Sequence, residues 1–361
     1  MTKLLRSHVG GNWHEGTGKR SSLFDPTTED VLAESSTEGL DFGAAVDFAR
    51  REGGPALRGM TFHQRGEMLQ AMASALHEYR DELLDLARQN GGNTRGDAKF
   101  DVDGATGTLS AYAKIASGLD EGTSFFADGE PLRLARSPRF VGRHLLRPLH
   151  GVAIHVNAFN FPAWGFAEKA AVALLAGMPV ITKPATSTAL LAERMIEILV
   201  EGKVLPAGAL SFIAGSVGDL LSHAGPQDVV AFTGSANTAY RIRSQENLLR
   251  QSVRVNVEAD SLNAAVLAPD VESGTDTFDL FLREVARDVT QKAGQKCTAI
   301  RRVLIPESMI EEAREALGEE IARTKVGNPA LREVRMGPLA TKGQLEDVQA
   351  GIDKLLEQSE L

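Results

Sequence analysis

Cysteine is nearly absent from this chain, whose 361 residues include only Cys297. A single thiol excludes an internal disulfide, so we expect a reducing compartment, the cytoplasm. Long apolar runs are missing as well. The most apolar stretch, residues 170–181, is interrupted by Gly177 and Pro179 and is far shorter than the ~20 residues that span a bilayer. The first residues have no signal-peptide core, and we expect no membrane association.

Clustered positive charge is also lacking, because the formal net charge is −9 at pH 7. Nucleic-acid grooves need gathered Lys and Arg, so no nucleic-acid partner is expected. A phosphate-bearing cofactor stays open, since it needs only a few well-placed donors. Apolar residues make up 43% and charged residues 24%, which is typical of a folded globular protein. The length predicts two or three domains.

The first 130 residues are predicted to be rich in helix. Residues 41–51, 61–78 and 81–89 carry apolar side chains at helical spacing. Residues 132–150 hold several arginines and no acidic residue, with a loose alternation of apolar and polar side chains. A two-stranded β-hairpin fits that stretch, and so does an exposed arm.

From residue 151 onward, short β-branched runs alternate with amphipathic segments. The predicted strands are 151–156, 179–183, 210–214, 228–232 and 252–257, and the predicted helices are 163–176, 187–200, 216–223 and 235–243. This alternation predicts a parallel sheet with helices on both faces. In such sheets ligands bind at the carboxyl ends of the strands.

A second α/β section is predicted after Glu258. Its strands are 264–267 and 302–305, and its helices are 278–293 and 307–324. A further helix is predicted to run to the last residues, 357–361, without a capping signal or a closing strand. We therefore expect this section to be incomplete.

Cys297 is a candidate nucleophile. A lone cysteine is more often a small buried hydrophobe than a catalyst. Here it follows the long predicted helix, and Gly294 and Gln295 permit a tight turn before it. Lys296 makes the surroundings more cationic, which favours a lowered thiol pKa and a reactive thiolate.

Glu258 and Asn160 are two further candidates at predicted strand ends. Glu258 suits a solvated carboxylate, or a general base that activates water. Asn160 suits a turn or cap residue, or a donor of a hydrogen bond to a developing oxyanion. These patterns alone do not choose between the readings.

Two connections between a strand and a helix suit a nucleotide. Lys183 is either a surface lysine or a cation for cofactor hydroxyls or phosphate beside a helix N-terminus. In Phe232-Thr233-Gly234-Ser235, Gly234 allows close backbone approach, and Ser235 opens a helix whose free N–H groups suit a pyrophosphate. The Gly-x-Gly-x-x-Gly fingerprint is absent. These motifs alone predict no more than a nucleotide-binding α/β protein.

The ordered set of motifs resembles the aldehyde dehydrogenase superfamily. The landmarks are Asn160-Phe161-Pro162, Lys183-Pro184, Phe232-Thr233-Gly234-Ser235, Glu258, Gly294-Gln295-x-Cys297 and Met336-Gly337-Pro338-Leu339. The resemblance covers essentially the whole chain, and it implies an α/β fold of three parts. These are a Rossmann-type parallel-sheet cofactor domain (1–131 and 149–257), a β-hairpin oligomerisation arm (132–148) and a second α/β catalytic domain (258–361).

The resemblance implies a role for each matching residue. Cys297 attacks the aldehyde, Asn160 and the Cys297 backbone N–H hold the oxyanion, and Glu258 activates the water that releases the acid. The reaction passes through a thiohemiacetal and a thioester, and a hydride goes to a nicotinamide cofactor. The implied cofactor-binding residues are Phe159, Lys183, Ala185, Thr186, Gly215, Gly234 and Ser235. No metal is implied, and the intact protein is expected to be a homodimer.

A narrower resemblance is carried by residues 157–165, 258–263 and 292–302. They are similar to the semialdehyde dehydrogenases of CoA-dependent aromatic degradation, which act in the phenylacetate and benzoyl-CoA epoxidation routes. Those enzymes oxidise ring-opened CoA-thioester semialdehydes and favour NADP. Many NAD-using relatives carry Glu where this chain has Thr186. Because a hydroxyl can donate to a 2′-phosphate and a carboxylate repels it, we expect NADP, with NAD as the alternative.

Departures from the family keep other activities open. Ala259-Asp260-Ser261 stands where most members have Gly-Gly after the base. Members also continue beyond residue 361, with a Glu-x-Phe segment that grips the nicotinamide ribose, so we expect a truncated catalytic domain. One alternative is a CoA-acylating dehydrogenase, which releases its thioester to CoA and not to water. The presence of Glu258 favours hydrolysis over this alternative. Another alternative is a catalytically silent scaffold. The retention of Cys297, Glu258 and Asn160 argues against it.

Overall fold

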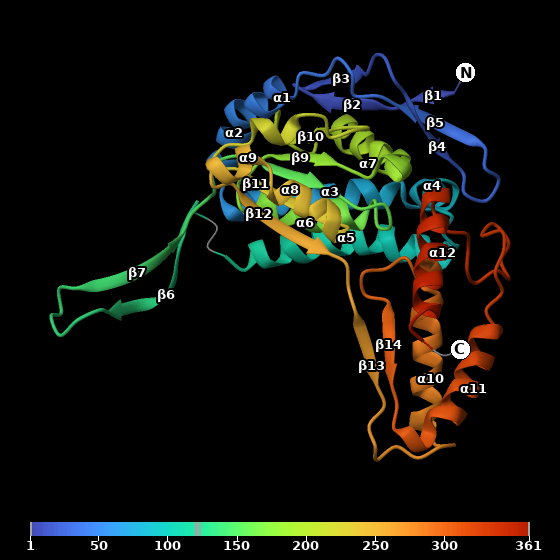
Figure 1. The fold of residues 1–361 in the computed structure, drawn as a ribbon. Coiled ribbons are helices and arrows are strands. Elements are labelled where there is room, and N and C mark those ends of the chain that lie inside the picture. The colour runs from blue at the N-terminus through green and yellow to red at the C-terminus, as the bar shows by residue number, and fades with distance from the viewer. Residues whose placement is uncertain (1, 120–121, 123, 360–361) are drawn as a thin grey trace.

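The computed structural model describes residues 2–119, 122 and 124–359. A seven-stranded sheet of order β12-β11-β8-β9-β10-β2-β3 forms its centre (Figure 1). Five neighbouring strands are parallel: β8 (Ala153–Val156), β9 (Val180–Lys183), β10 (Leu210–Phe212), β11 (Val229–Gly234) and β12 (Arg254–Ala259). Val156 pairs with Lys183 and Thr233 pairs with Glu258. The carboxyl ends of these strands therefore lie along one edge.

Helices cover both faces of this sheet, as the alternating pattern predicted. Consecutive strand residues point to opposite faces, so Ala153 packs into one buried cluster and Ile154 into the other. The first face carries α3 (Phe62–Glu78), α4 (Arg80–Gly91), α5 (Arg95–Ser117), α6 (Trp164–Leu175) and α7 (Ala189–Glu201). The second face carries α1 (Phe42–Phe48), α8 (Ala236–Arg243) and α9 (Glu246–Arg250). The predicted helix 216–223 is only a 3₁₀ turn, Leu220–His223, because Gly218 has a left-handed φ of 48°.

The amino-terminal section contains strands that the helical spacing did not indicate. They are β1 (Lys3–Leu4), β2 (Arg6–Val9), β3 (Asn12–Glu15), β4 (Ser21–Phe24) and β5 (Val31–Ser35). β2 pairs with β10 antiparallel, so the β2–β3 hairpin extends the large sheet, while β1, β5 and β4 form a small one. The predicted helix 41–51 becomes α1, a π-helical stretch (Ala49–Gly53) and the short α2 (Gly54–Gly59). The long α5 was also missed, because Gly96, Gly104 and Gly107 dilute its apolar pattern.

A two-stranded hairpin, β6 (Phe126–Arg133) and β7 (Val141–Leu146), projects away from the sheet (Figure 1). It begins before residue 132, so the predicted boundary between 131 and 132 falls inside β6. The reason is local: Asp128, Gly129 and Pro131 are poor strand residues, and the pairing register shifts between Asp128 and Leu132. The other domain boundaries, and the role of the arm in oligomerisation, stay predictions.

The region after the large sheet is built from β13 (Asn263–Val266), β14 (Ile300–Leu304), α10 (Asp276–Thr290), α11 (Ile310–Ala322) and α12 (Lys342–Leu356). β13 and β14 are parallel and pack with α10 and α11 around Phe278, Leu282 and Met309. α10 ends at Thr290, earlier than predicted, and α12 ends at Leu356. The helix predicted to run to the last residues is therefore α12, which does not extend to 357–359, and residues 360 and 361 lie outside the described residues.

None of the helices in the described part of the chain has the length and apolarity that a membrane crossing requires. Within the same residues, no group of three or more His, Cys, Asp or Glu side chains is placed to hold a metal ion.

Candidate active site

Cys297, Glu258 and Asn160 line a single cavity of about 230 Å³. Asn160 lies in the loop between β8 and α6, Glu258 lies on β12, and Cys297 lies in the turn after α10. Asn160 and Glu258 therefore lie at the carboxyl edge of the large sheet. Cys297 reaches the same cavity from the β13–β14 region. The rest of the cavity wall is formed by Phe100, Ala158, Phe161, Trp164, Gly165, Glu168, Lys169, Thr233 and Thr298.

The turn that carries Cys297 has an uncommon backbone. Lys292, Ala293 and Gly294 have φ values of 53°, 52° and 71°. Residues other than glycine avoid this left-handed region, because it costs them about 1–2 kcal/mol each. The turn is held from outside, because the Lys292 backbone N–H donates to Asp97 Oδ1 at 3.0 Å. The predicted tight turn therefore begins at Lys292, before Gly294.

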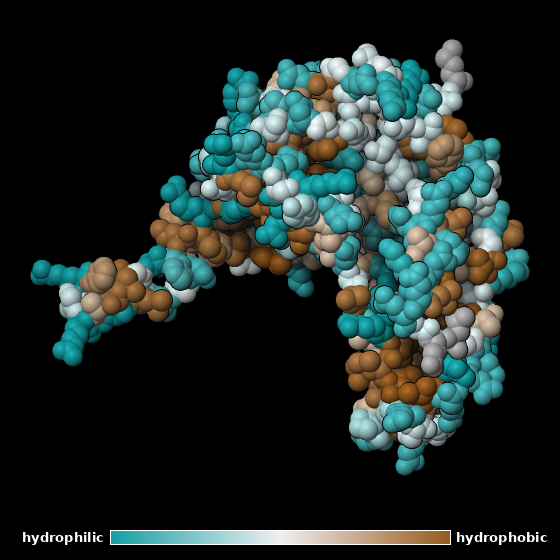
Figure 2. Space-filling view, in the orientation of Figure 1, coloured by the Kyte–Doolittle hydropathy of each residue, from teal (hydrophilic) through white to brown (hydrophobic). Residues whose placement is uncertain are grey.

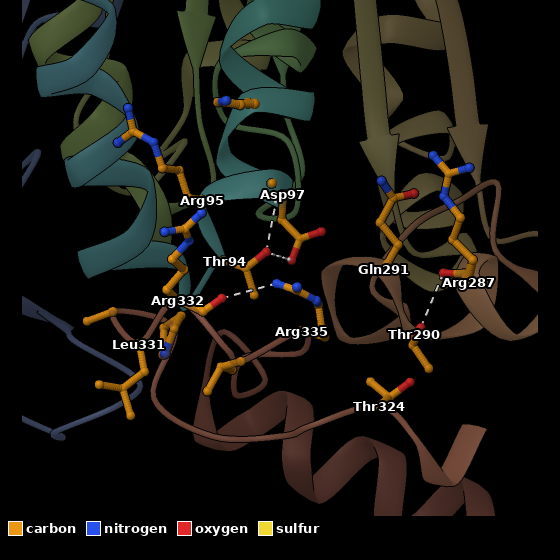
Figure 3. Close-up of a pocket in the computed structure, with 15 residues that line it drawn as sticks. Thr94, Arg95, Asp97, Arg287, Thr290, Gln291, Thr324, Leu331, Arg332 and Arg335 are labelled. Carbon is orange, nitrogen blue, oxygen red and sulfur yellow. Dashed lines mark hydrogen bonds between the residues drawn. The ribbon is translucent and has the colours of Figure 1, made fainter. Parts of the chain in front are cut away.

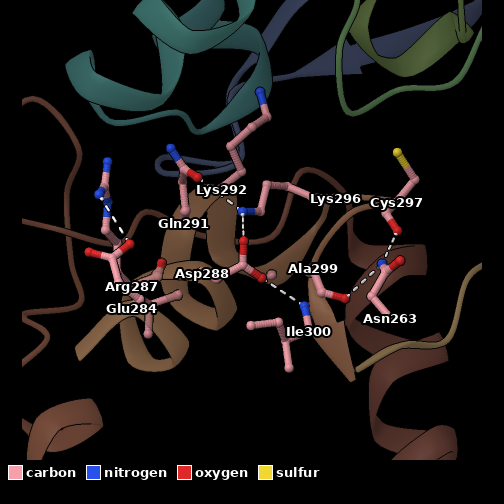
Figure 4. A network of polar contacts seen from close by, with 12 residues as sticks. Asn263, Glu284, Arg287, Asp288, Gln291, Lys292, Lys296, Cys297, Ala299 and Ile300 are labelled. Atoms are coloured by element: carbon pink, nitrogen blue, oxygen red, sulfur yellow. Dashed lines mark hydrogen bonds and ion pairs between the residues drawn. The ribbon is translucent and has the colours of Figure 1, made fainter. Parts of the chain in front are cut away.

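The surroundings of the thiol differ from the expectation of a cationic site. Lys296 is only 4% exposed, and its Nζ donates to Asp288 Oδ1 at 2.7 Å and to Gln291 Oε1 at 2.9 Å. Figure 4 shows this ammonium turned away from the Cys297 sulfur. Burial, and after it the Glu258 carboxylate, raise the pKa of the Cys297 thiol. The predicted lowering of this pKa was wrong, because Asp288 neutralises Lys296.

Hydrogen bonds position both Glu258 and Asn160. Thr233 Oγ1 donates to Glu258 Oε2 at 3.3 Å, as the pairing of these two residues across β11 and β12 requires. Glu258 is exposed, and its carboxylate also interacts with the Cys297 thiol. Asn160 Nδ2 donates to the Gln295 carbonyl at 2.9 Å. Because an amide NH₂ carries two N–H donors, the second is available to a ligand in the cavity.

The predicted cofactor residues on β8 and β9 lie at the same edge of the sheet. Lys183 is the last residue of β9, and burial lowers the pKa of its ammonium to about 8. Ala185 and Thr186 follow in the connection to α7. The Phe159 carbonyl accepts from Thr188 Oγ1 at 3.0 Å, which ties this connection to the loop after β8.

The remaining cofactor candidates follow β10 and β11. A Cβ at Gly215, where φ is 142°, would come within 3.0 Å of Thr37, and a Cβ at Gly234 would lie 2.5 Å from the Phe232 ring. Both glycines are therefore also needed for packing. Ser235 caps α8 by accepting from Thr238 N–H at 3.3 Å. Asp260, one of the departures from the family, accepts from Ala236 N–H at 3.2 Å at the same helix end.

Several cavity residues were not predicted as site residues from the sequence. Lys169 Nζ pairs with Glu168 Oε1 at 2.8 Å inside the cavity wall. Phe161, Trp164 and Glu168 recur at helical spacing after Asn160, so their common face was a usable signal. Phe100 comes from α5, far away in sequence, and no local pattern indicates it.

A larger cleft of about 740 Å³ lies between the start of α5, the end of α10 and residues 324–335 (Figure 3). It is lined by Arg95, Lys99, Arg287, Arg332 and Arg335. Arg95 pairs with Asp81 and Arg287 with Glu284. Within the described residues, no carboxylate lies at ion-pair distance from the other three cations. The cleft is thus a local excess of positive charge in an acidic chain.

Comparison with known proteins shows the family of this chain. The model of the aldehyde dehydrogenase family matches residues 13–360. The chain is 47% identical over 357 residues to the 3,4-dehydroadipyl-CoA semialdehyde dehydrogenase of Aromatoleum evansii, covering 99% of this chain and 69% of that protein. A betaine aldehyde dehydrogenase from Staphylococcus aureus, solved with NAD⁺, has a TM-score of 0.86 at 22% identity, covering 98% and 70% of the two chains. An aldehyde dehydrogenase from Bacillus cereus, also with NAD⁺, has a TM-score of 0.84 at 23% identity, covering 99% and 70%.

The chain therefore belongs to the aldehyde dehydrogenase family, and it is an oxidoreductase that acts on aldehydes. The resemblance to the semialdehyde dehydrogenases of CoA-dependent aromatic degradation is confirmed by the relative from Aromatoleum evansii. The predicted fold class is confirmed by the two solved structures, which share its architecture.

Proposed function

We propose that this chain oxidises a CoA-thioester semialdehyde from aromatic catabolism to the carboxylic acid, with NADP as the electron acceptor. The observation that carries the chemistry is the cavity in which Cys297, Glu258 and Asn160 meet. The substrate class is supported by the 47% identical relative, whose name states a CoA-linked semialdehyde.

The residues support a reaction through covalent intermediates on sulfur. Cys297 loses its proton to solvent, and the thiolate attacks the aldehyde carbon. The free N–H of the Asn160 amide stabilises the oxyanion of the thiohemiacetal. Loss of the aldehyde hydrogen with two electrons gives a thioester, and a bound nicotinamide supplies the acceptor for them. Glu258 then deprotonates the water that cleaves the carbon–sulfur bond and releases the acid.

The residues at the strand ends fit a nicotinamide dinucleotide. Lys183 offers an ammonium for hydroxyls or phosphate, and Ser235 offers a hydroxyl at the start of α8. Phe159, Ala185, Gly215 and Gly234 line the connections at this edge, and Thr186 supplies a hydroxyl for a 2′-phosphate. Asp260 occupies the Ala236 N–H of α8, so a pyrophosphate here shares the helix end with that carboxylate or displaces it. NAD is the alternative cofactor, because the similar solved structures carry NAD⁺.

The CoA part of the substrate is supported by the positive cleft. Lys99 lines the cleft and Phe100, the next residue, lines the catalytic cavity. Gln291 lines the cleft six residues before Cys297 (297 − 291 = 6), so its Cα lies at most about 22 Å from that of Cys297. Lys99, Arg332 and Arg335 can therefore receive phosphates of a thioester whose acyl end reaches the thiol.

The proposal is tested by steady-state oxidation of a CoA-thioester semialdehyde and of a free aldehyde with the same chain length. We expect a lower KM for the thioester, faster turnover with NADP than with NAD, and a free acid as the product. The Arg332→Ala and Arg335→Ala variants should raise only the thioester KM, while Arg314→Ala, an exposed arginine paired with Glu311, should change neither KM. Equal KM values for both substrates would refute the CoA assignment, and transfer of the acyl group to CoA would favour the acylating alternative.

We also propose that the hairpin arm joins two copies in a homodimer and that the enzyme works in the cytoplasm. The arm exposes apolar side chains that suit an interface, among them Leu132 (58%) and Phe140 (58%). Light scattering after size exclusion tests the dimer: Leu132→Asp with Phe140→Asp should give monomers, and an unchanged mass would refute this use of the arm.

A further inference from the structure

Lys292 is a buried lysine next to the active site. Its side chain is only 4% exposed, and no described residue accepts a hydrogen bond from its Nζ. The Nζ lies 4.4 Å from the centroid of the Phe161 ring. A buried ammonium without an acceptor is costly, and a contact with an aromatic face offsets only part of that cost. Such an arrangement directly behind a residue of the cavity wall, Phe161, points to a function.

Two buried carboxylates supply the counter-charge. Asp97 and Asp101 are four residues apart on α5, hence on one face of the helix, and they are 4% and 0% exposed. Asp97 holds the Lys292 backbone N–H, and Asp101 accepts from the Trp164 N–H at 2.8 Å where α6 begins. Burial lowers the pKa of the Lys292 ammonium, while the charges of Asp101 and Asp97 oppose that change. Lys292 thus links the turn before Cys297 to α5, and Asp101 of α5 in turn holds the start of α6.

Phe161 belongs to a set of three rings, Phe100, Phe161 and Trp164, which we call the aromatic wall. The ring centroids are 5.3 to 5.9 Å apart and the rings meet edge to face. All three line the cavity that contains Cys297. Gly104 leaves room for this packing, because a Cβ there would lie 2.5 Å from the Trp164 ring. The wall therefore sets the width of the cavity beside the thiol.

We propose that Lys292 is a positioning residue that fixes the aromatic wall relative to Cys297 and thereby makes the cavity selective for narrow, unbranched acyl chains. Its backbone begins the left-handed turn that leads to the nucleophile, and its ammonium lies over Phe161, the neighbour of Asn160. One residue thus sets the distance between the thiol and the wall. This inference rests on the proposed use of the cavity for the aldehyde.

The first test compares Lys292→Met, Lys292→Arg and the control Lys114→Met, which changes an exposed lysine of α5. We expect Lys292→Met to raise the KM for an unbranched aldehyde about tenfold and to reduce the preference over a branched one. The cofactor KM should stay unchanged. Arginine should restore most of the loss, because a guanidinium also lies over aromatic faces. An aldehyde KM of Lys292→Met within twofold of the parent would overturn the proposal, as would an equal rise in the cofactor KM.

A second readout needs no turnover. The chain has two tryptophans, so Trp13→Phe leaves Trp164 of the aromatic wall as the only indole emitter. Lys292→Met in that background should increase acrylamide quenching of Trp164, whereas Lys292→Arg and Lys114→Met should not. Unchanged quenching overturns the role of Lys292, while parent protein that oxidises no aldehyde counts against the proposed function alone. If Lys292→Met fails to fold, the double variant Lys292→Met with Asp101→Asn replaces it, because this variant removes the charges of Lys292 and Asp101 together. The same two results are expected for the double variant.

Discussion

The large sheet and the β13–β14 region contribute to the same cavity but are held together differently. The sheet is covered by helices on both faces and buries residues such as Ile154, Ile181 and Phe232. The β13–β14 region has a small buried cluster, α12 buries no side chain, and Val266 and Leu304 are 65% and 53% exposed. Figure 2 shows apolar side chains gathered on the surface of that region.

The difference shows where precision in the site comes from. On the sheet side, the register of the parallel strands alone sets the positions of Lys183 and Glu258 along the strand direction. On the other side, the turn before Cys297 is held by a few polar contacts, from Asp97 to Lys292 and from Asn160 and Ala340 to Gln295. Substitutions in the sheet should therefore act first on stability, and substitutions around the turn should act first on catalysis.

The largest effect should come from Cys297→Ala, which removes the proposed nucleophile and leaves the sheet intact. We expect a loss of turnover on the order of 10⁴-fold or more. Cofactor affinity should stay at the parent value, since the cofactor candidates lie on the sheet. Aldehyde-dependent absorbance of reduced nicotinamide and a cofactor titration measure the two quantities. Turnover within tenfold of the parent would show that the turn does not carry the nucleophile.

Glu258→Gln changes the sheet residue that acts directly on the turn. Thioester formation should persist while hydrolysis slows by about 10²- to 10⁴-fold, so mass spectrometry should find acylated Cys297. The thiol pKa should also fall, because the Glu258 carboxylate raises it in the parent. Alkylation of the single cysteine by iodoacetamide at neutral pH should then become faster. Normal turnover with unmodified protein would refute the assignment of Glu258 as the base.

Thr186→Glu tests the sheet side through the cofactor. A carboxylate near the ribose should repel a 2′-phosphate and accept from a 2′-hydroxyl, shifting the ratio of kcat/KM values towards NAD by about tenfold, equivalent to ~1.4 kcal/mol. The aldehyde KM should not change, because Thr186 does not line the catalytic cavity. An unchanged NADP to NAD ratio would contradict the assigned place of the 2′-phosphate.

His155 of β8 tests the stability of the sheet itself. It is 2% exposed, its Nδ1 has no hydrogen-bond partner among the described residues, and burial lowers its pKa to about 3. Between this value and the unfolded value near 6.5, the unfolded chain binds more protons, so acid lowers the free energy of unfolding by about 1.4 kcal/mol per pH unit. Urea unfolding at several pH values should show a shallower pH dependence for His155→Leu. An unchanged slope would mean that His155 is not neutral in the folded sheet.

The sequence predicted the sheet side well and the turn side poorly. Buried β-branched runs such as Val180-Ile181-Thr182 indicate their own structure, because a parallel strand is covered on both faces. The hairpin β2–β3 was not predicted, since its place in the sheet depends on β10, about 200 residues away. From the sequence, Lys296 was expected to act on the neighbouring thiol. Its actual partner is Asp288, near the end of α10, and only folding brings these two side chains together. Folding also brings Phe100 into the cavity and places Lys292 against Phe161. These segments are distant in sequence, so no local spacing predicts their contacts.

The most direct test of the account mixes the chain with NADP and the CoA thioester of a semialdehyde, then follows NADPH and identifies the product by mass spectrometry. We predict one free carboxylic acid on the CoA thioester for each NADPH formed, faster turnover than with the matching free aldehyde, and no reaction with Cys297→Ala. Turnover that survives this substitution, or a product whose new acyl group is transferred to CoA, would contradict the account.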